Sequence, residues 1–170
     1  MKPSPSKADQ ESVDNFRFEA QEFCKFLDNC THFDQSNLVH RISELVARLC
    51  LAGIRLPEIQ PATDDSAEFA AGSVKESSEE CVRLATRLRK QLGSLDEYSE
   101  VFDPTEDQEA VRCSLSIDLA EMYMDLKEAL EQETGLAADV YWQWRFDFVS
   151  HWSRHAASAL RVLLILSSRV

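Results

Sequence analysis

The chain of 170 residues is 44% hydrophobic and 28% charged, which is typical of one globular domain large enough to bury a core. It has no run of roughly eighteen apolar residues and it begins with a polar segment, so we expect neither a transmembrane helix nor a secretory signal. The net charge of −12 at pH 7 argues against binding to nucleic acids or anionic lipid surfaces, since both require a basic protein surface.

The five cysteines are odd in number and form no CxxC pair; they are Cys24, Cys30, Cys50, Cys81 and Cys113. Most of them take the place of a small apolar residue in a helical pattern, which favours reduced thiols that pack in the interior. The cysteine pattern therefore predicts a cytoplasmic protein.

Hydrophobic residues recur at helical spacing along most of the chain, and no segment alternates as a half-buried strand does. We therefore expect an all-α, single-domain bundle of about five helices over residues 13–170, after a disordered tail at residues 1–12. The pattern places the helices at about residues 13–30, 36–52, 74–92, 103–134 and 136–168, with a loop over 54–73. Three of the four glycines, Gly53, Gly93 and Gly135, stand where a helical pattern stops, as expected for residues that end helices.

Two of these helices carry a signal at their first residue. Ser36 is expected to be the N-cap of the second helix. In Asp103-Pro104-Thr105-Glu106, the aspartate suits the N-cap, the proline suits the first helical position, and Glu106 can complete a capping box. The fourth helix is therefore expected to begin at Asp103.

The last expected helix is apolar on two faces rather than one. At about 100° per residue, one face carries Tyr141, Trp144, Phe148, His151, His155, Ala159, Val162 and Leu166, and the other carries Trp142, Phe146, Val149, Leu160 and Leu164. Such a helix is largely buried, either at the centre of a bundle or in a dimer interface. The dense aromatic run favours core packing over a site that stacks a ligand.

Two histidines stand among the apolar residues of the first face. Because His151 and His155 are four residues apart, their side chains point the same way from a helix. A histidine pair at this spacing is compatible with a metal site. The HExxH zinc motif is absent, since Trp152 and not glutamate follows the first histidine.

A metal site in a helical bundle would also need carboxylates from a facing helix. Asp118, Glu121 and Asp125 share one side of the preceding helix. One hypothesis is therefore a metal-dependent hydrolase or other bundle metalloprotein, in which a divalent metal is bound by His151, His155, Asp118 and Asp125. Glu121 would be a further ligand or the general base that deprotonates metal-bound water.

The same residues allow other interpretations. A histidine that donates to a carboxylate is a satisfied polar element of a helix core, and Arg154 and Arg161 could join such a network; we favour this structural role. Alternatively, Arg154 and Arg161 could line a pocket for a small anionic ligand if neither has a carboxylate partner. Since no catalytic signature is complete and the last helix is apolar on two faces, the leading functional hypothesis is protein–protein binding or self-association.

Three segments combine an aspartate-rich pattern with a histidine–tryptophan pattern: EVFDP (100–104), DLAEMYMDLKEAL (118–130) and WQWRFDFVSHWSRHAASALRVL (142–163). They resemble a bacterial family, domain of unknown function 5063, and the resemblance covers residues 12–166. The matching positions are Asp118, Tyr123, Asp125, Phe146, Phe148, His151, Trp152, His155 and Arg161. Ser153 departs from the glycine that members often have there, which a helix tolerates. The resemblance implies a helical fold and the same polar residues, and it implies no particular activity.

Overall fold

The computed structural model describes residues 6–61, 79–101, 105, 109–131 and 137–169. Within these ranges the chain forms α1 (Lys7–Asn29), α2 (Gln35–Ile54), α4 (Glu79–Leu92) and α5 (Leu115–Glu131). The C-terminal helix has three parts, which are α6 (Ala137–Asp147), the π-helical turn η2 (Phe148–Trp152) and α7 (Ser153–Ser167). A 3-10 turn η1 (Gly93–Leu95) and the strands β1 (Glu97–Glu100) and β2 (Val111–Ser114) lie between α4 and α5. The predicted all-α bundle is confirmed.

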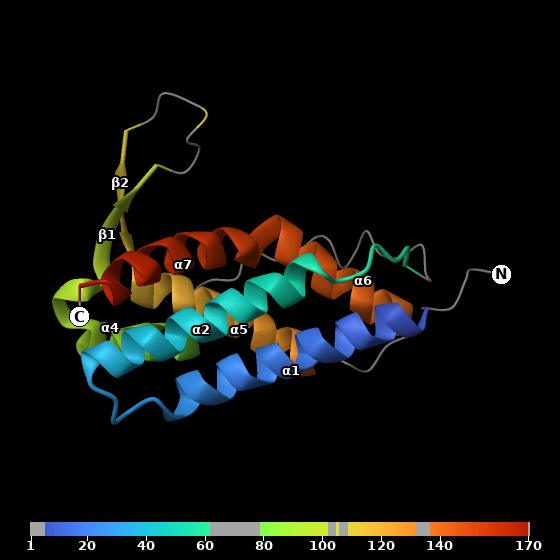
Figure 1. Cartoon of the computed structure of the whole chain (residues 1–170), viewed down its shortest axis with the longest axis horizontal. Helices are drawn as coiled ribbons and strands as arrows, with labels where there is room; N and C mark the ends of the chain where they lie inside the picture. Colours follow the sequence, from blue (N-terminus) through green and yellow to red (C-terminus); the bar gives the residue numbers. More distant parts are fainter. Residues whose placement is uncertain (1–5, 62–78, 102–104, 106–108, 132–136, 170) are drawn as a thin grey trace.

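The long helices lie side by side, and the strand pair projects from one end of the bundle, near the end of α7 (Figure 1). Helix α1 packs on α2 and α5, α2 packs on α7, and α5 packs on both α4 and α7. α5 and α7 are therefore neighbours. This pairing brings aspartates of α5 into contact with histidines of η2 and α7.

Two helices begin earlier than expected because of their caps. Helix α1 begins at Lys7, where Ser6 Oγ accepts from Asp9 N at 3.1 Å and Asp9 accepts from Ser6 N at 2.8 Å. This reciprocal capping box makes residues 7–12 helical, so their assignment to a disordered tail was wrong. For α2 the N-cap is Asp34 rather than Ser36, since Asp34 Oδ1 accepts from Asn37 N at 2.9 Å.

The core is continuous through the helices and has a cluster of aromatic rings near one end. Phe16 of α1 lies between Trp144 and Trp152, with ring centroids 5.2 and 6.0 Å away. The Trp144 indole donates to the carbonyl of Ala129 at 3.1 Å, so its polar atom is satisfied. Both tryptophans are 1% exposed, which confirms core packing for that part of the aromatic run.

The glycines differ in their roles. Gly93 has φ +55° at the end of α4, so the prediction that it closes a helix is confirmed. Gly53 lies inside α2 and does not adopt that conformation, and the prediction there was wrong. A Cβ at Gly53 would lie 2.7 Å from the Phe148 ring, so glycine allows close packing of α2 on η2. Gly135 lies outside the described residues.

The start of α5 was also predicted wrongly. Its first residue is Leu115, directly after β2, and β1 pairs with β2 in antiparallel register with Tyr98 opposite Cys113. Asp96 caps this helix from the other side of the hairpin, because its carbonyl accepts from Leu115 N at 2.8 Å and its Oδ1 accepts from Ser116 N at 2.7 Å. The Asp103–Glu106 signal lies largely outside the described residues.

The two faces of the C-terminal helix differ in burial. The first face is covered by the bundle, with Tyr141, Trp144, Phe148, Ala159, Val162 and Leu166 all buried. On the second face Val149 and Leu164 are each 58% exposed, while Trp142, Phe146 and Leu160 are partly buried. The second apolar face therefore remains accessible over part of its length.

Candidate functional site

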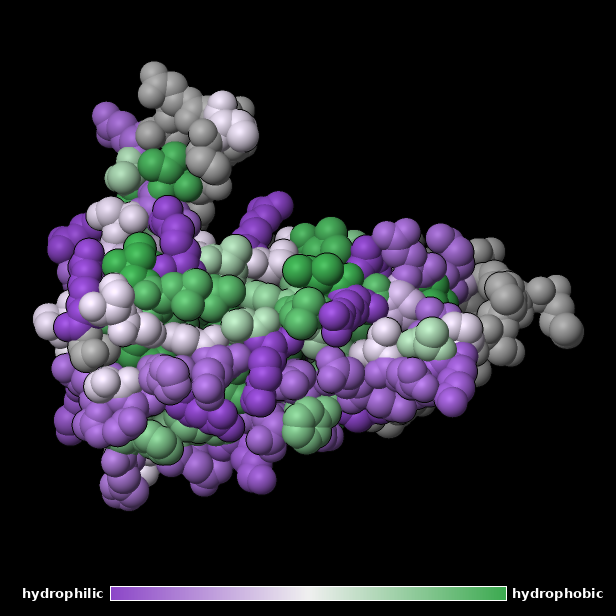
Figure 2. Space-filling model, viewed as in Figure 1, coloured by the Kyte–Doolittle hydropathy of each residue, from purple (hydrophilic) through white to green (hydrophobic). Residues whose placement is uncertain are grey.

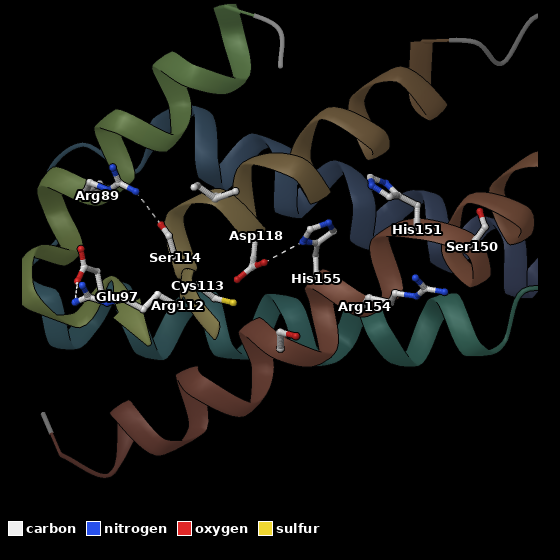
Figure 3. A pocket seen from close by; sticks show the side chains of 12 residues that line it. Arg89, Glu97, Arg112, Cys113, Ser114, Asp118, Ser150, His151, Arg154 and His155 are labelled. Atoms are coloured by element: carbon white, nitrogen blue, oxygen red, sulfur yellow. Dashed lines mark hydrogen bonds and ion pairs between the residues drawn. The ribbon is translucent and has the colours of Figure 1, made fainter. Parts of the chain in front are cut away.

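A pocket of about 590 Å³ opens between the strand pair, α5 and the C-terminal helix (Figure 3). Arg89 of α4 and Arg112 and Cys113 of β2 line one side of it. The other side carries His151 of η2 with Arg154 and His155 of α7, and Asp118 of α5 lies between the two groups (Figure 3). The pocket thus contains four of the seven polar residues that the sequence singled out.

The first polar contact in the pocket is a chain of three side chains. His155 Nδ1 lies 2.9 Å from Asp118 Oδ1, and the Tyr98 hydroxyl donates to Asp118 Oδ2 at 2.5 Å. The hydrogen bond to Asp118 raises the pKa of His155 above its ordinary value, although burial of the ring acts in the opposite sense. Burial, followed by the contact with Asp118, raises the pKa of Tyr98 well above its usual range, so the phenol stays a proton donor.

The second contact repeats the first one about a turn away. His151 Nδ1 lies 2.5 Å from Asp125 Oδ2, and the centroids of the two imidazole rings are 5.2 Å apart at an interplanar angle of 74°. Asp125, the later of the two aspartates, contacts His151, the earlier of the two histidines, because α5 and α7 pack antiparallel. The His151 side chain is 51% exposed and that of His155 is 29% exposed.

Both imidazoles use the same nitrogen for these contacts. Within the described residues, neither Nε2 atom has a hydrogen-bond or ion-pair partner. The aspartates therefore fix the orientation of the rings and leave Nε2 available to a ligand. This arrangement agrees with the structural network that the sequence favoured, and it also presents two ring nitrogens at an open pocket.

The two arginines have different environments. Arg161 forms an ion pair with Glu100 of β1 at 3.0 Å and is not part of the pocket lining. Arg154 lines the pocket and is exposed, and no hydrogen bond or ion pair involves it across the part of the chain that the structure describes. Neither arginine pairs with Asp118, Glu121 or Asp125, so the predicted pairing of these groups was wrong.

The four residues proposed to bind a metal do come together, but as two histidine–aspartate pairs. Asp118 and Asp125 contact the imidazoles, and Glu121 accepts a weak hydrogen bond from the Cys81 thiol at 3.7 Å, toward α4. In the described ranges, no group of three or more histidine, cysteine, aspartate or glutamate side chains is placed to hold a metal ion.

Several residues of the site had no signal in the sequence. Arg89 contacts Asp96 Oδ2 at 3.0 Å and Ser114 Oγ at 3.2 Å, and Arg112 pairs with Glu97 at 2.7 Å. Arg89 was expected near the end of the third helix and Arg112 in the early part of the fourth, where the structure has a strand instead. Without a predicted strand pair, nothing in the sequence placed them beside α7.

The fold and the site define a class, that of helical-bundle domains with a pocket between two helices and a strand pair. The family model described as "Domain of unknown function (DUF5063)" matches residues 7–168, and the chain belongs to this family. A search of curated proteins found no match. The crystal structure of protein BF1032 from Bacteroides fragilis is similar, with a TM-score of 0.71, 22% sequence identity and 91% of each chain covered. That similarity supports the fold.

No helix in the described ranges has the length and apolar character needed to cross a membrane.

Proposed function

We propose that the protein binds a small anionic molecule in the pocket between α5, α7 and the strand pair. The observation that carries this proposal is Arg154, a guanidinium that lines the pocket without an ionic partner in the described parts of the chain. In a protein with a net charge of −12, an arginine that remains unpaired beside a pocket is suited to a ligand carboxylate or phosphate.

The carboxylates of the pocket do not oppose an anion strongly, because each already has a partner. Glu97 is paired with Arg112, and Asp118 accepts hydrogen bonds from both His155 and Tyr98. The two imidazoles can add hydrogen bonds from Nε2 to the same ligand. Polar groups whose orientation is fixed by their partners are typical of small-molecule pockets.

The test is binding of inorganic phosphate, pyrophosphate and citrate, measured by calorimetry and by thermal shift in a chelator-containing buffer. Arg154→Gln should weaken binding of the best anion by at least about tenfold, since a charge-assisted hydrogen bond contributes about 1.5–3 kcal/mol. Arg83→Gln is the matched control, because it removes the same charge from an exposed side chain of α4. Equal affinity in Arg154→Gln and wild type would exclude this role for the pocket.

A second candidate function is self-association through the exposed apolar face of the C-terminal helix. Among the described residues, half of the large hydrophobic side chains that are exposed belong to α2, η2 or α7; they are Leu51, Ile54, Val149, Leu164 and Ile165. Figure 2 shows hydrophobic side chains gathered along the α7 side of the molecule, above a mostly hydrophilic band over α1. A patch of this kind favours an interface, and sedimentation at rising concentration tests it.

The setting we propose is the cytoplasm, with no nucleic-acid partner. All five cysteines are free thiols, and three of them are buried, which suits a reducing compartment. The acidic net charge supports the absence of nucleic-acid binding.

A further inference from the structure

We propose that His151 and His155 together bind one divalent transition-metal ion through their Nε2 atoms, and that a bound anion completes its coordination. The role of the anion rests on the proposed function, whereas the two-histidine site does not depend on it. Asp118 and Asp125 are positioning residues in this proposal rather than ligands, which differs from the four-ligand site that the sequence suggested.

The first support is the way in which the aspartates hold the rings. A histidine that binds a metal usually donates its other ring N–H to a carboxylate, which fixes the tautomer and raises the basicity of the metal-binding nitrogen. Here both Nδ1 atoms contact aspartates of α5, at 2.9 Å for His155 and 2.5 Å for His151. With Nδ1–H donated to an aspartate, Nε2 is the ring nitrogen that a metal ion would bind in place of a proton. Two adjacent histidines thus share the orientation that metal ligation needs.

The second support is the spacing of the rings. A bond of about 2.0–2.1 Å from Nε2 to the metal places each ring centroid roughly 3.2 Å from the ion, so two rings at a tetrahedral angle have centroids roughly 5 Å apart. The centroids of His151 and His155 are 5.2 Å apart. Both rings lie in the same opening beside α5 (Figure 3). The spacing of the two rings is therefore compatible with a single ion bound by both.

The third support is the charge around the pair. Asp118 and Asp125 of α5 contact the two imidazole rings directly, at 2.9 Å for His155 and 2.5 Å for His151. The same carboxylates would stabilise a cation bound at Nε2. A metal ion bound there would add positive charge beside the pocket, where an anionic ligand could complete its coordination.

The site offers two protein nitrogens, because no group of three ligating side chains is assembled in the described ranges. A tetrahedral ion would then have two further positions, open to water or to an anionic ligand. Imidazole ligands suit Ni²⁺, Cu²⁺ and Zn²⁺ better than Mg²⁺ or Ca²⁺, which prefer oxygen. The site should therefore select a transition metal and release it readily to a chelator.

The experiment is calorimetric titration of Ni²⁺ into the untagged full chain after removal of metals by a chelator. We expect one Ni²⁺ per chain for wild type, and loss of that binding in His151→Ala/His155→Ala. The matched control is His32→Ala/His40→Ala, which removes the other two histidines of the chain and should bind as wild type does. Asp118→Asn and Asp125→Asn keep both imidazoles and should weaken binding about 10–100-fold. Circular dichroism of each variant establishes that it is folded.

Three results would overturn the proposal: no Ni²⁺ binding by wild type, retained binding in the His151/His155 double variant, or an equal loss in the His32/His40 control. If the double variant does not fold, His151→Ala alone decides, since that ring is half exposed and its removal leaves the core intact. Phosphate titrated with and without Ni²⁺ separates the two proposals. Metal binding without any anion binding would contradict the pocket function alone, and anion binding in chelator without metal binding would contradict the metal site alone.

Discussion

Among single residues, Asp96 links α4, the strand pair and α5. Its side chain is 1% exposed, and it accepts hydrogen bonds from Ser116 N at 2.7 Å, Ser114 Oγ at 2.8 Å and Arg89 Nε at 3.0 Å. Burial acts to raise the pKa of Asp96, but these hydrogen bonds outweigh it and hold the pKa below its ordinary value. Asp96 is therefore charged in the native protein and stabilises it in that form.

We predict that Asp96→Asn lowers the free energy of unfolding at pH 7 by about 1–3 kcal/mol, because a charged acceptor is lost from buried donors. A lowered native pKa gives a contribution that is complete above the unfolded value of about 4 and is lost as the pH falls through the native value. Urea denaturation from pH 7 to pH 2 should therefore show the difference between wild type and variant shrinking in acid.

The control for this prediction is Glu97→Gln, the neighbouring carboxylate, which is exposed and pairs with exposed Arg112. Such a surface pair contributes about 0–1 kcal/mol, so this variant should have nearly wild-type stability. A constant difference between Asp96→Asn and wild type at every pH would show that the charge of Asp96 has no part in its effect.

Among the elements, the π-helical turn η2 sets how the C-terminal helix meets α2. Phe148 begins this turn, and its ring occupies the space where a side chain at Gly53 would be. We predict that Gly53→Ala lowers the free energy of unfolding by about 1–3 kcal/mol, the usual cost of overpacking, despite the better helix propensity of alanine. Thermal and urea denaturation of the variant measure this cost.

A double-mutant cycle tests the cause of that cost. Phe148→Leu shortens the side chain that the new methyl group would meet, so Gly53→Ala should cost less in that background than in wild type. Additive effects of the two substitutions would mean that the contact between α2 and η2 is not the reason for the glycine.

The helices could be predicted from the sequence, but the strand pair could not. The helices of the bundle carry long apolar stripes, and the i, i+4 spacing of His151 and His155 was enough to place both on one face beside the aspartates of the preceding helix. The strand pair was missed because each strand has four residues, with Glu, Ser and Arg among them and no deeply buried side. The roles of Tyr98 and Asp96 depend on this pair, so pattern alone could not reveal them.

For the whole molecule, the apolar face of the C-terminal helix and the net charge act against each other. Val149 and Leu164 are each 58% exposed on that face and favour association, whereas a charge of −12 on every chain makes two copies repel. Salt shortens the range of that repulsion, from about 10 Å at 0.1 M to about 3 Å at 1 M, and leaves apolar contacts in place.

We therefore predict that the protein dimerises more strongly as the salt concentration rises, which sedimentation velocity at several protein concentrations will measure. Leu164→Glu should abolish the dimer, because it places a carboxylate in the centre of the apolar contact. Val82→Glu adds the same charge at a similarly exposed position on α4 and should leave the dimer intact. A monomer at every salt concentration, or equal loss of the dimer in the two variants, would mean that this face has another use than self-association. Since the pocket is lined from α4, the strand pair, α5 and residues of the C-terminal helix that do not include Leu164, Leu164→Glu should leave anion binding at the wild-type affinity.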